Sequence, residues 1–549
     1  MTIAERLAAV DAEQPVRPLA ELVGRLEHEG LLRGVRAGDG RPVAPTLVGT
    51  APGEPVLVAG LAADSRSVRP GSLFVAVPGD HVDGHEFAAQ AVAAGARALI
   101  VERPIAGARV IQLVVGRSRA ALATAAAWWY GDPSHGLGIV GITGTDGKTT
   151  TSFLAAAALT AAGLRAGLVG TVEVRVGGEA EPTPEHQTTP EAPELQRLLR
   201  AMVVAGDQAA VVETTSHGLA LDRVAGIAYD AAIFTNLSHE HLELHGSFEA
   251  YRAAKLSLFE RLAARGITKT GAGAGLAWPR LAVINRDDSS GDLFVAVSRE
   301  AGARVVTYGA EAGADVRAVR VEEDARRLSL AYEAPSGAAR LSLRLAGRFN
   351  VHNALAVVAL GEGLGLDSAA VRSGIEGLAG VPGRMERIER GQPFTVIVDY
   401  AHSPASLETV LDLLAPVAAA GGGGLLVVFG SAGERDVAKR PMMGRIAGER
   451  CRLVVVTDED PRGEDRLEIL EAIGRGAEAA GRRRGRDLLL IPDRAEAIAA
   501  ALERARPGDV VLFAGKGHER TIIGPTGPVP WNERSAVEAA LAALGYAGS

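Results

Sequence analysis

The stretch GTDGKTT, residues 144–150, combines glycines, a lysine and threonines in an order that suits phosphate binding. Glycines let backbone N–H groups converge on a phosphate, and the start of a helix adds positive potential. In such a loop the amine of Lys148 can reach the terminal phosphates, and the hydroxyl of Thr149 can bind Mg²⁺. The apolar run before the loop and the Ala-rich run after it predict a flanking strand and helix. We therefore expect this loop to bind a nucleoside triphosphate.

A carboxylate and several histidines lie downstream, where they could complete a metal site. Glu213 ends the apolar run AAVVE, and a carboxylate at a strand end beside a phosphate loop is a natural ligand for Mg²⁺. His239, His241 and His245 follow the next predicted strand. Three histidines beside acidic neighbours could instead hold zinc. We favour Mg²⁺ with one histidine in its shell, because the nucleotide already requires this ion.

The phosphate loop alone does not separate a kinase, a GTPase and a ligase. A GTPase needs a base-reading element of the NKxD type, and the sequence has none. A P-loop switch or binding protein that hydrolyses ATP stays open as an alternative of another class.

The elements that must position these residues follow an α/β rhythm. Short apolar runs separated by helical patterns indicate mostly parallel sheets covered on both faces. Alternating residues between 314 and 345 predict a small antiparallel sheet added to the central domain. We predict a lead-in over 1–55 with a helix at 19–32, and α/β domains over 56–136, 137–380 and 381–549.

Composition places the chain among soluble globular proteins. It has 549 residues, 47% of them hydrophobic, and a net charge of −8, so no basic field favours nucleic acid. A single cysteine, Cys451, excludes an internal disulfide and fits a reducing compartment. No apolar run reaches the length of a membrane span. We expect a cytoplasmic protein, and a monomer.

Many motifs together resemble those of one family. The phosphate loop is followed in order by ETTSHGL, TNLSHEHLELHG, YRAAKLSLF, GRFNVHNALA, PGRME, VDYAHSPASL, GERDVAKRP and GKGHE, and DSRSVRPGSLFVAVPGDHVDGHEF precedes it. This set is similar to Mur ligases, and most of all to their MurE branch. The resemblance covers residue 56 to the C-terminus. It implies an N-terminal UDP-binding α/β domain, a central P-loop ATPase and a C-terminal Rossmann-like domain that receives an amino acid.

The resemblance also implies a reaction. ATP phosphorylates the D-glutamate carboxylate of UDP-MurNAc-L-Ala-D-Glu, and the amine of a diamino acid then displaces phosphate from the acyl phosphate. Two anions must meet in the first step, so Lys148, Mg²⁺ and loop amides have to neutralise charge there. Another Mur-type ligase acting on a modified wall precursor stays open as an alternative.

Site residues carry over by motif. The implied catalytic residues are Lys148, Glu213, His241 and Lys255, and the implied Mg²⁺ ligands are Thr149, Glu213, His241 and Lys255. Composition alone would place Lys255 on the surface, whereas the resemblance makes it a carbamylated lysine (N6-carboxylysine). A carbamate is an anionic oxygen ligand, and an ammonium would be repelled by the metal.

Three further sets follow from the same motifs. The ATP contacts are Gly144, Thr145, Asp146, Gly147, Lys148, Thr149, Thr150, Asn353, Arg384, Asp399 and His402. The UDP-MurNAc-dipeptide contacts are Ser65, Asp80, His81, Thr188, Thr189, Thr215 and Arg223. The amino-acid contacts are Arg435, Glu459, Asp460, Arg462, Gly515 and Glu519. Asp146 stands where relatives carry Asn, and we expect it to cap the following helix.

The stretch DEDPR bears on which amino acid is added. The diaminopimelate signature of the family is DNPR, whose arginine grips the distal carboxylate, and Arg462 keeps that role here. Asp460 stands in place of Asn, and an extra acid favours a more cationic substrate such as L-lysine or L-ornithine. We favour meso-2,6-diaminopimelate because Arg462 and Arg435 suit a second carboxylate, and we expect Glu519 to pair with the distal ammonium.

Overall fold

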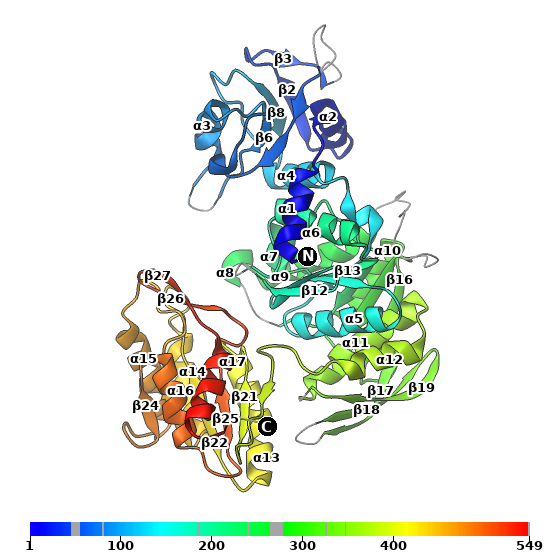
Figure 1. Ribbon diagram of the computed structural model, residues 1–549. Helices are drawn as coiled ribbons and strands as arrows, with labels where there is room; N and C mark the ends of the chain where they lie inside the picture. The colour runs from blue at the N-terminus through cyan, green and yellow to red at the C-terminus, as the bar shows by residue number, and fades with distance from the viewer. Residues whose placement is uncertain are drawn as a thin grey trace. The chain divides into compact units, whose positions relative to one another are not determined.

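The computed structural model describes residues 1–45, 55–79, 82–183, 187–238, 242–263, 269, 278–323, 327–345 and 347–546. Two compact units divide the chain. The first comprises Met1–Val321, Leu330–Leu341 and Phe349–Gly377, and the second comprises Glu322–Ser329, Ser342–Arg348 and Leu378–Ser549. Both units are built from sheets and helices, as predicted, and Figure 1 shows the order of these elements along the chain.

The N-terminal sheet holds six strands of the described chain in the order β3-β2-β8-β7-β6-β5. Their bounds are Leu32–Arg36 for β2, Pro42–Val43 for β3, Gly60–Ala62 for β5, Ser72–Val75 for β6, Ala98–Val101 for β7 and Ile111–Val115 for β8. Strands β5 to β8 run parallel, and β2 pairs antiparallel with β8. Beside this sheet, β1 (Arg17–Pro18) pairs with β4 (Leu57–Val58).

Helices α2 (Leu19–His28) and α4 (Ser118–Trp129) pack on this sheet through an apolar cluster that includes Leu22, Leu26 and Trp128. The short helix α3 is Ala88–Ala93. We expected residues 1–55 to precede this domain as a separate lead-in, and that division is wrong. Helix α2 and strand β2 are part of the domain, because β2 finds its partner β8 about eighty residues further along the chain.

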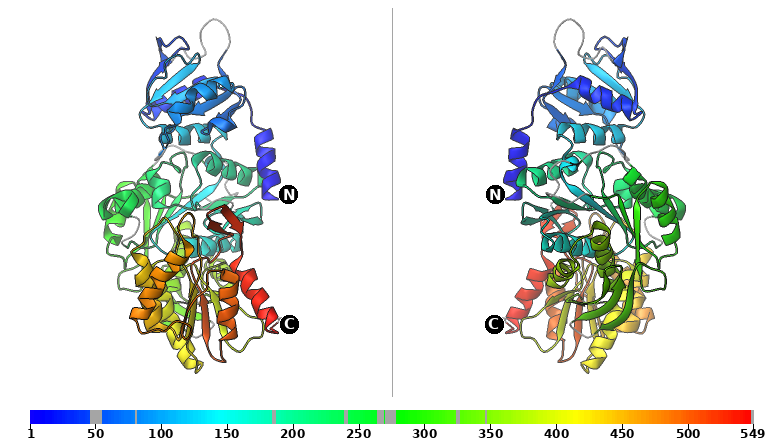
Figure 2. Two further views of the ribbon diagram at one scale, coloured as in Figure 1. Left: turned by 90° about the vertical axis from the view of Figure 1, so that its left-hand side faces the viewer. Right: turned by 90° about the vertical axis from the view of Figure 1, so that its right-hand side faces the viewer.

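The first helix, α1 (Ile3–Ala12), packs elsewhere in the same unit. It lies against α6 (Ala192–Ala205), and Figure 2 shows it as the dark-blue helix at the N-terminus. Its buried residues Ile3 and Val10 join the apolar core of the central sheet. Asp11 forms an ion pair with Arg197 of α6 at 2.5 Å. The N-terminal helix is therefore an element of the central domain in packing, although it precedes the N-terminal sheet in sequence.

The central sheet holds eleven strands of the described chain in the order β12-β11-β10-β13-β9-β14-β15-β16-β17-β18-β19. Their bounds are Gly138–Thr143 for β9, Ala166–Val169 for β10, Glu173–Val176 for β11, Glu179–Pro182 for β12, Ala209–Glu213 for β13, Ala231–Phe234 for β14, Leu281–Asn285 for β15, Arg304–Gly309 for β16, Val316–Glu323 for β17, Leu328–Ala334 for β18 and Gly337–Leu343 for β19. Strands β10 to β17 run parallel apart from the β11–β12 hairpin. The strands expected as an added sheet, β17 to β19, continue the edge of this one.

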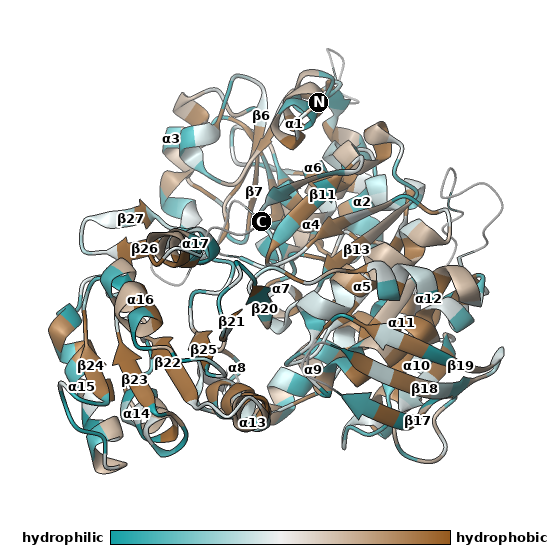
Figure 3. Cartoon of the chain, turned by 60° about the horizontal axis from the view of Figure 1, so that its bottom comes forward, coloured by the Kyte–Doolittle hydropathy of each residue, from teal (hydrophilic) through white to brown (hydrophobic). Residues whose placement is uncertain are grey.

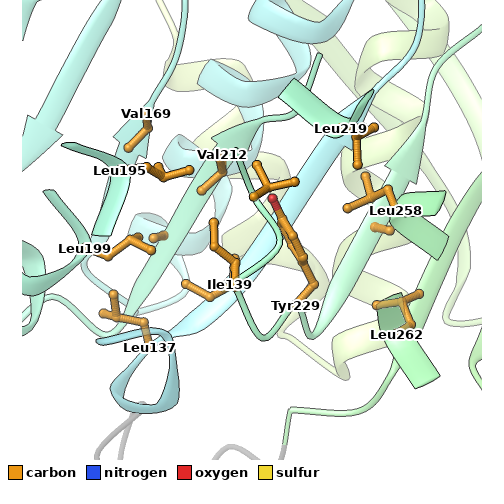
Figure 4. Close-up of a cluster of buried hydrophobic side chains, with 14 of the residues drawn as sticks. Leu137, Ile139, Val169, Leu195, Leu199, Val212, Leu219, Tyr229, Leu258 and Leu262 are labelled. Atoms are coloured by element: carbon orange, nitrogen blue, oxygen red, sulfur yellow. The ribbon is translucent and has the colours of Figure 1, made fainter. Parts of the chain in front are cut away.

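Helices cover the central sheet on both faces (Figure 1). They are α5 (Lys148–Ala161), α7 (Ser216–Ala220), α8 (Leu242–His245), α9 (Phe248–Glu260), α10 (Gly291–Glu300), α11 (Phe349–Leu364) and α12 (Ser368–Gly377), with α6. Figure 4 shows one core, in which Ile139 and Val212 of the sheet meet Leu195 of α6 and Leu258 of α9. Because the central strands are apolar on both faces, they are buried throughout, as the continuous apolar runs predicted.

The second unit contains a sheet with the order β20-β21-β25-β22-β23-β24 among its described strands. Their bounds are Glu386–Ile388 for β20, Thr395–Val398 for β21, Leu425–Phe429 for β22, Leu453–Val456 for β23, Leu488–Leu490 for β24 and Val510–Phe513 for β25. All run parallel except β20. Figure 3 shows β22, β23 and β25 as hydrophobic strands. A hairpin of β26 (Thr521–Gly524) and β27 (Gly527–Pro530) follows.

The helices of the second unit are α13 (Pro404–Ala420), α14 (Lys439–Arg450), α15 (Arg466–Ala479), α16 (Arg494–Glu503) and α17 (Glu533–Ala543). They form two apolar clusters with the sheet. Polar residues follow the carboxyl ends of β21, β23 and β25, which is where ligands bind in open α/β sheets.

Candidate active site

The phosphate loop joins β9 to α5 at the middle of the central sheet, between the ends of β13 and β14. Two of its glycines have positive φ, 150° at Gly144 and 83° at Gly147. A Cβ on Gly144 would lie 1.8 Å from the hydroxyl of Thr235, and one on Gly147 would lie 2.4 Å from Oδ1 of Asn353. Only glycine fits at these two positions, because a Cβ would clash with Thr235 or Asn353 and because the positive φ disfavours other residues.

The side chain of Lys148 lies across this loop. Its Nζ donates to the carbonyl oxygens of Gly144 and Thr145 at 3.0 and 2.6 Å. The hydroxyl of Thr149, one residue on, is buried and donates to Oε2 of Glu213 at 3.1 Å. The structure therefore brings the predicted phosphate and metal residues of the loop beside the predicted carboxylate.

Asp146 does not cap α5, contrary to our expectation. The residue before the helix is Gly147, and no side chain makes a cap hydrogen bond there. The left-handed conformation of Gly147 places Asp146 one residue too early for that role. Its main chain is held instead, since its N–H donates to Oδ1 of Asn236 at 2.9 Å and its carbonyl accepts from Thr235 at 2.6 Å. Asp146 itself is exposed.

Glu213 is fully buried at the end of β13. Besides Thr149, its carboxylate accepts two hydrogen bonds from Thr171, from the backbone N–H at 3.1 Å and from the hydroxyl at 2.9 Å. Its main-chain carbonyl accepts from the hydroxyl of Thr189 at 2.8 Å. The buried carboxylate at the end of β13 and the hydroxyl at the start of α5 form an oxygen donor set of the kind that Mg²⁺ prefers.

Lys255 lies on α9 with 1% of its surface exposed. Its Nζ donates to the carbonyl oxygen of Gly144 at 2.7 Å and lies 4.4 Å from the ring centroid of Tyr251. The Tyr251 hydroxyl in turn bonds the hydroxyl of Thr145 at 3.0 Å. Lys255 is therefore not on the surface but directly beneath the phosphate loop. His241, the fourth predicted metal ligand, lies outside the described residues.

The residues predicted to hold the muramoyl-dipeptide gather beside Glu213. The Thr189 hydroxyl is 3.0 Å from that of Thr215, and the Arg223 guanidinium donates to the Thr189 carbonyl at 3.0 Å. The hydroxyl of Thr188 lies 2.9 Å from that of Thr171. The predicted UDP neighbour Ser65 lies in the N-terminal domain, where its hydroxyl bonds Gln90 at 3.4 Å. Asp80 and His81 lie outside the described residues.

The remaining predicted ATP contacts divide between the two units. Asn353 of α11 accepts from the hydroxyl of Thr151 at 3.2 Å, so it lies beside α5 in the first unit. Arg384, Asp399 and His402 belong to the second unit. There the Arg384 guanidinium lies 4.8 Å from the ring of Tyr400. Burial raises the pKa of Asp399, and the nearby Arg384 opposes this rise.

The predicted amino-acid contacts lie in the second unit, after β22, β23 and β25. Asp460 is buried, and its Oδ1 pairs with Nζ of Lys516 at 2.9 Å. The same ammonium pairs with Glu519 at 2.5 Å. Asp460 also accepts the backbone N–H of Ile523 at 2.8 Å. The buried cation Lys516 thus bridges Asp460 and Glu519. The sequence did not identify Lys516 as a site residue, although the motif GKGHE contains it.

The other predicted amino-acid contacts are Glu459, Gly515, Arg462 and Arg435. Glu459 is 6% exposed, and its Oε2 is buried with no hydrogen-bond partner among the described residues. Gly515 has φ of 98°, and a Cβ there would lie 3.0 Å from this oxygen. Arg462 has φ of 54°, and its Nε is likewise buried and unpartnered within the described chain. Arg435 is exposed.

Together these features define a P-loop α/β protein with a buried carboxylate beside the phosphate loop and a second polar cluster at another sheet. Its segments match three family models: 57–130 the Mur ligase family catalytic domain, 142–361 the Mur ligase middle domain, and 383–517 the Mur ligase glutamate ligase domain.

Individual relatives agree with these matches. A UDP-N-acetylmuramyl-tripeptide synthetase of Roseiflexus sp. (strain RS-1) is 49% identical over 497 residues, which cover 89% of this chain and 96% of the relative. A UDP-N-acetylmuramoyl-L-alanyl-D-glutamate–2,6-diaminopimelate ligase of Geobacter metallireducens is 41% identical, covering 89% and 95%. A solved structure of a ligase with the latter name is 30% identical with a TM-score of 0.62, covering 90% and 96%. The chain therefore belongs to the Mur ligase family and is a ligase.

Proposed function

We propose that the chain is an ATP-dependent amide ligase that adds meso-2,6-diaminopimelate to UDP-MurNAc-L-Ala-D-Glu. The names of the relatives at 39–49% identity support this activity. The observation that carries it is the double role of Glu213. Its carboxylate accepts a hydrogen bond from Thr149 at the phosphate loop, and its main-chain carbonyl accepts one from Thr189, which we propose binds the acceptor peptide. One buried residue thus links the phosphate loop to the residues that we propose hold the acceptor.

The first step joins the acceptor to phosphate. A carboxylate oxygen of the D-glutamate forms a bond to the γ-phosphorus of ATP while the bond to the ADP oxygen breaks. Lys148 and the loop N–H groups neutralise the negative charge that otherwise keeps these two anions apart. Thr188, Thr189, Thr215 and Arg223 hold the acceptor peptide, so the carboxylate and the phosphate meet in a fixed geometry.

The oxygen donors described above fit Mg²⁺. Thr149, Glu213 and the carbamate of Lys255 would hold it, and we propose His241 as a further ligand. Bound there, Mg²⁺ supplies positive charge to the phosphate oxygens. Lys255 lies at the right place for this role, since its Nζ reaches Gly144 of the loop.

The second step adds the amino acid. Its neutral amine attacks the acyl carbon, the bond to the phosphate oxygen breaks, and the amine loses a proton as the amide forms. We propose that Arg462 and Arg435 hold the distal carboxylate and that Glu459 and Glu519 hold the distal ammonium. Lys516 pairs with both Asp460 and Glu519, so it balances one of these two charges and leaves the other for the distal ammonium. The two arginines then favour diaminopimelate, which also carries a distal carboxylate.

The test is phosphate release from ATP with and without UDP-MurNAc-L-Ala-D-Glu, followed by incorporation of radiolabelled amino acids. We expect release to require the acceptor and an amino acid, and diaminopimelate to be incorporated in preference to lysine and ornithine. Phosphate release that ignores the acceptor would favour an ATPase switch. Preference for lysine would overturn the choice of amino acid alone. We propose that the enzyme works as a cytoplasmic monomer, which sedimentation of the purified protein tests in part.

A further inference from the structure

Thr171 is the second residue after β10, and none of the sequence motifs points to it. Its hydroxyl nevertheless lies at the centre of the site. It is 2.9 Å from Oε2 of Glu213, 2.9 Å from the hydroxyl of Thr188 and 3.4 Å from that of Thr149. Its backbone N–H donates to the other oxygen of Glu213 at 3.1 Å. Thr171 therefore forms hydrogen bonds with both carboxylate oxygens of Glu213 and also contacts Thr188, one of the residues predicted to hold the acceptor.

The single hydroxyl proton of Thr171 decides the direction of these bonds. A carboxylate can only accept, so the proton of Thr171 points to Glu213. The bond between the two threonine hydroxyls must then be donated by Thr188. Thr188 consequently has lone pairs, and no proton, left for a ligand. It can receive an N–H group of a peptide but cannot donate to a carboxylate oxygen.

The fold does not need this hydroxyl. The turn after β10 is closed by other groups: the Thr183 N–H donates to the Val172 carbonyl at 3.2 Å, and the Thr183 hydroxyl donates to the Gly170 carbonyl at 2.6 Å. Val169 and Val174 pair across the β10–β11 hairpin. Thr171 contributes its hydroxyl only to the polar site.

We propose that Thr171 is a positioning residue that orients the Glu213 carboxylate for Mg²⁺ and links it to the acceptor through Thr188. The proposal rests on the proposed function for the identity of the acceptor. The role of Thr171 toward Mg²⁺ does not depend on the acceptor and requires only that the loop bind a nucleotide. Groups that hold a metal-binding carboxylate typically change metal affinity by about 10–100-fold when removed.

The test compares Thr171→Val, which has nearly the same shape without the hydroxyl, with Thr171→Ser, which keeps it. Thr160→Val is the matched control, since it removes a threonine hydroxyl that bonds only the Ala156 carbonyl of its own helix among the described residues. Titration calorimetry measures Mg²⁺ binding in the presence of the β,γ-methylene analogue of ATP. Thermal unfolding confirms that each variant is folded.

We expect Thr171→Val to weaken Mg²⁺ binding by about tenfold or more, and Thr171→Ser and Thr160→Val to match the wild type. In the ligase assay, Thr171→Val should also raise the KM of the acceptor. Unchanged Mg²⁺ binding in Thr171→Val, or an equal loss in Thr171→Ser or Thr160→Val, would overturn the proposal. A wild type that binds Mg²⁺ with the analogue but ignores the muramoyl acceptor would overturn the proposed function instead.

Discussion

The ammonium groups of Lys148 and Lys255 donate to the same acceptor, the carbonyl oxygen of Gly144, at 3.0 and 2.7 Å. Two cations at one neutral acceptor repel each other, and Lys255 is almost completely buried. The carbamate that we propose for Lys255 would remove this repulsion and replace a like-charge contact with an attraction. This contact supports the proposal that the buried Lys255, and not the half-buried Lys148, is carbamylated.

Replacement of Lys255 by alanine tests this assignment. We expect Lys255→Ala to lose at least about 100-fold in kcat, because both the anionic metal ligand and its position are lost. Short carboxylic acids added to the assay should restore part of the activity by occupying the space of the carbamate. Arg252→Ala, on the same helix and away from Gly144, should keep wild-type activity. Full activity of Lys255→Ala would contradict the assignment.

Arg462 provides a test of amino-acid selection. Its Nε is buried and unpartnered within the described chain, so a ligand carboxylate is a natural acceptor. We expect Arg462→Ala to raise the KM for diaminopimelate by about 10–100-fold, the equivalent of a hydrogen bond to a charged group. The KM for ATP should stay unchanged. Arg445→Ala removes an exposed arginine of α14 and serves as the control. Equal effects of Arg462→Ala on both substrates would point to a folding defect instead.

Lys516 is expected to stabilise the second unit through its two carboxylate partners. It is fully buried, so Lys516→Met leaves Asp460 and Glu519 as neighbouring charges without their cation. The free energy of unfolding should fall by about 3 to 5 kcal/mol, measured by urea denaturation. The double variant with Asp460→Asn should recover part of this loss. If the double variant is no more stable than Lys516→Met, the ion pair is not the reason for the loss.

Cys451 offers a prediction about pH. Burial raises the pKa of its thiol to about 12, because the thiolate is the charged form. The thiol stays neutral in the native protein at any pH well below that value. Its contribution to stability is complete below the ordinary pKa of a thiol and is lost as the pH rises from there through the folded value. We expect no reaction with Ellman's reagent at pH 8 in the native state, and one thiol per chain after unfolding in guanidinium. Rapid reaction of the native protein would contradict the buried position.

Much of the site could be predicted from local sequence. Gly144 and Glu213 lie at strand ends marked by apolar runs, and Lys148 begins the Ala-rich helix that follows, so both elements can be identified without knowledge of the fold. Lys255 could be placed only by resemblance, since nothing around it in sequence shows that α9 lies under the phosphate loop. Thr171 could not be predicted at all. Its importance comes from the pairing of β10 with β13, which brings it to Glu213 across 42 residues of chain.

The same limit applies to the fold. The continuous apolar runs of β9, β13 and β14 identified the central sheet, whereas β2 has a short, polar sequence that shows no strand pattern. The place of β2 in the N-terminal sheet depends on its pairing with β8, and a partner so distant in sequence cannot be recognised from the residues around β2. Lys516 illustrates the point for side chains: its two acidic partners come from different loops.

Because α1 packs on α6, two segments of chain connect the N-terminal sheet to the central core instead of one. The chain leaves the central core after α1 to build that sheet, and it returns to the central core after α4. Two covalent connections restrict the motion of a domain more than one does. Removal of the first twelve residues would leave only the connection after α4.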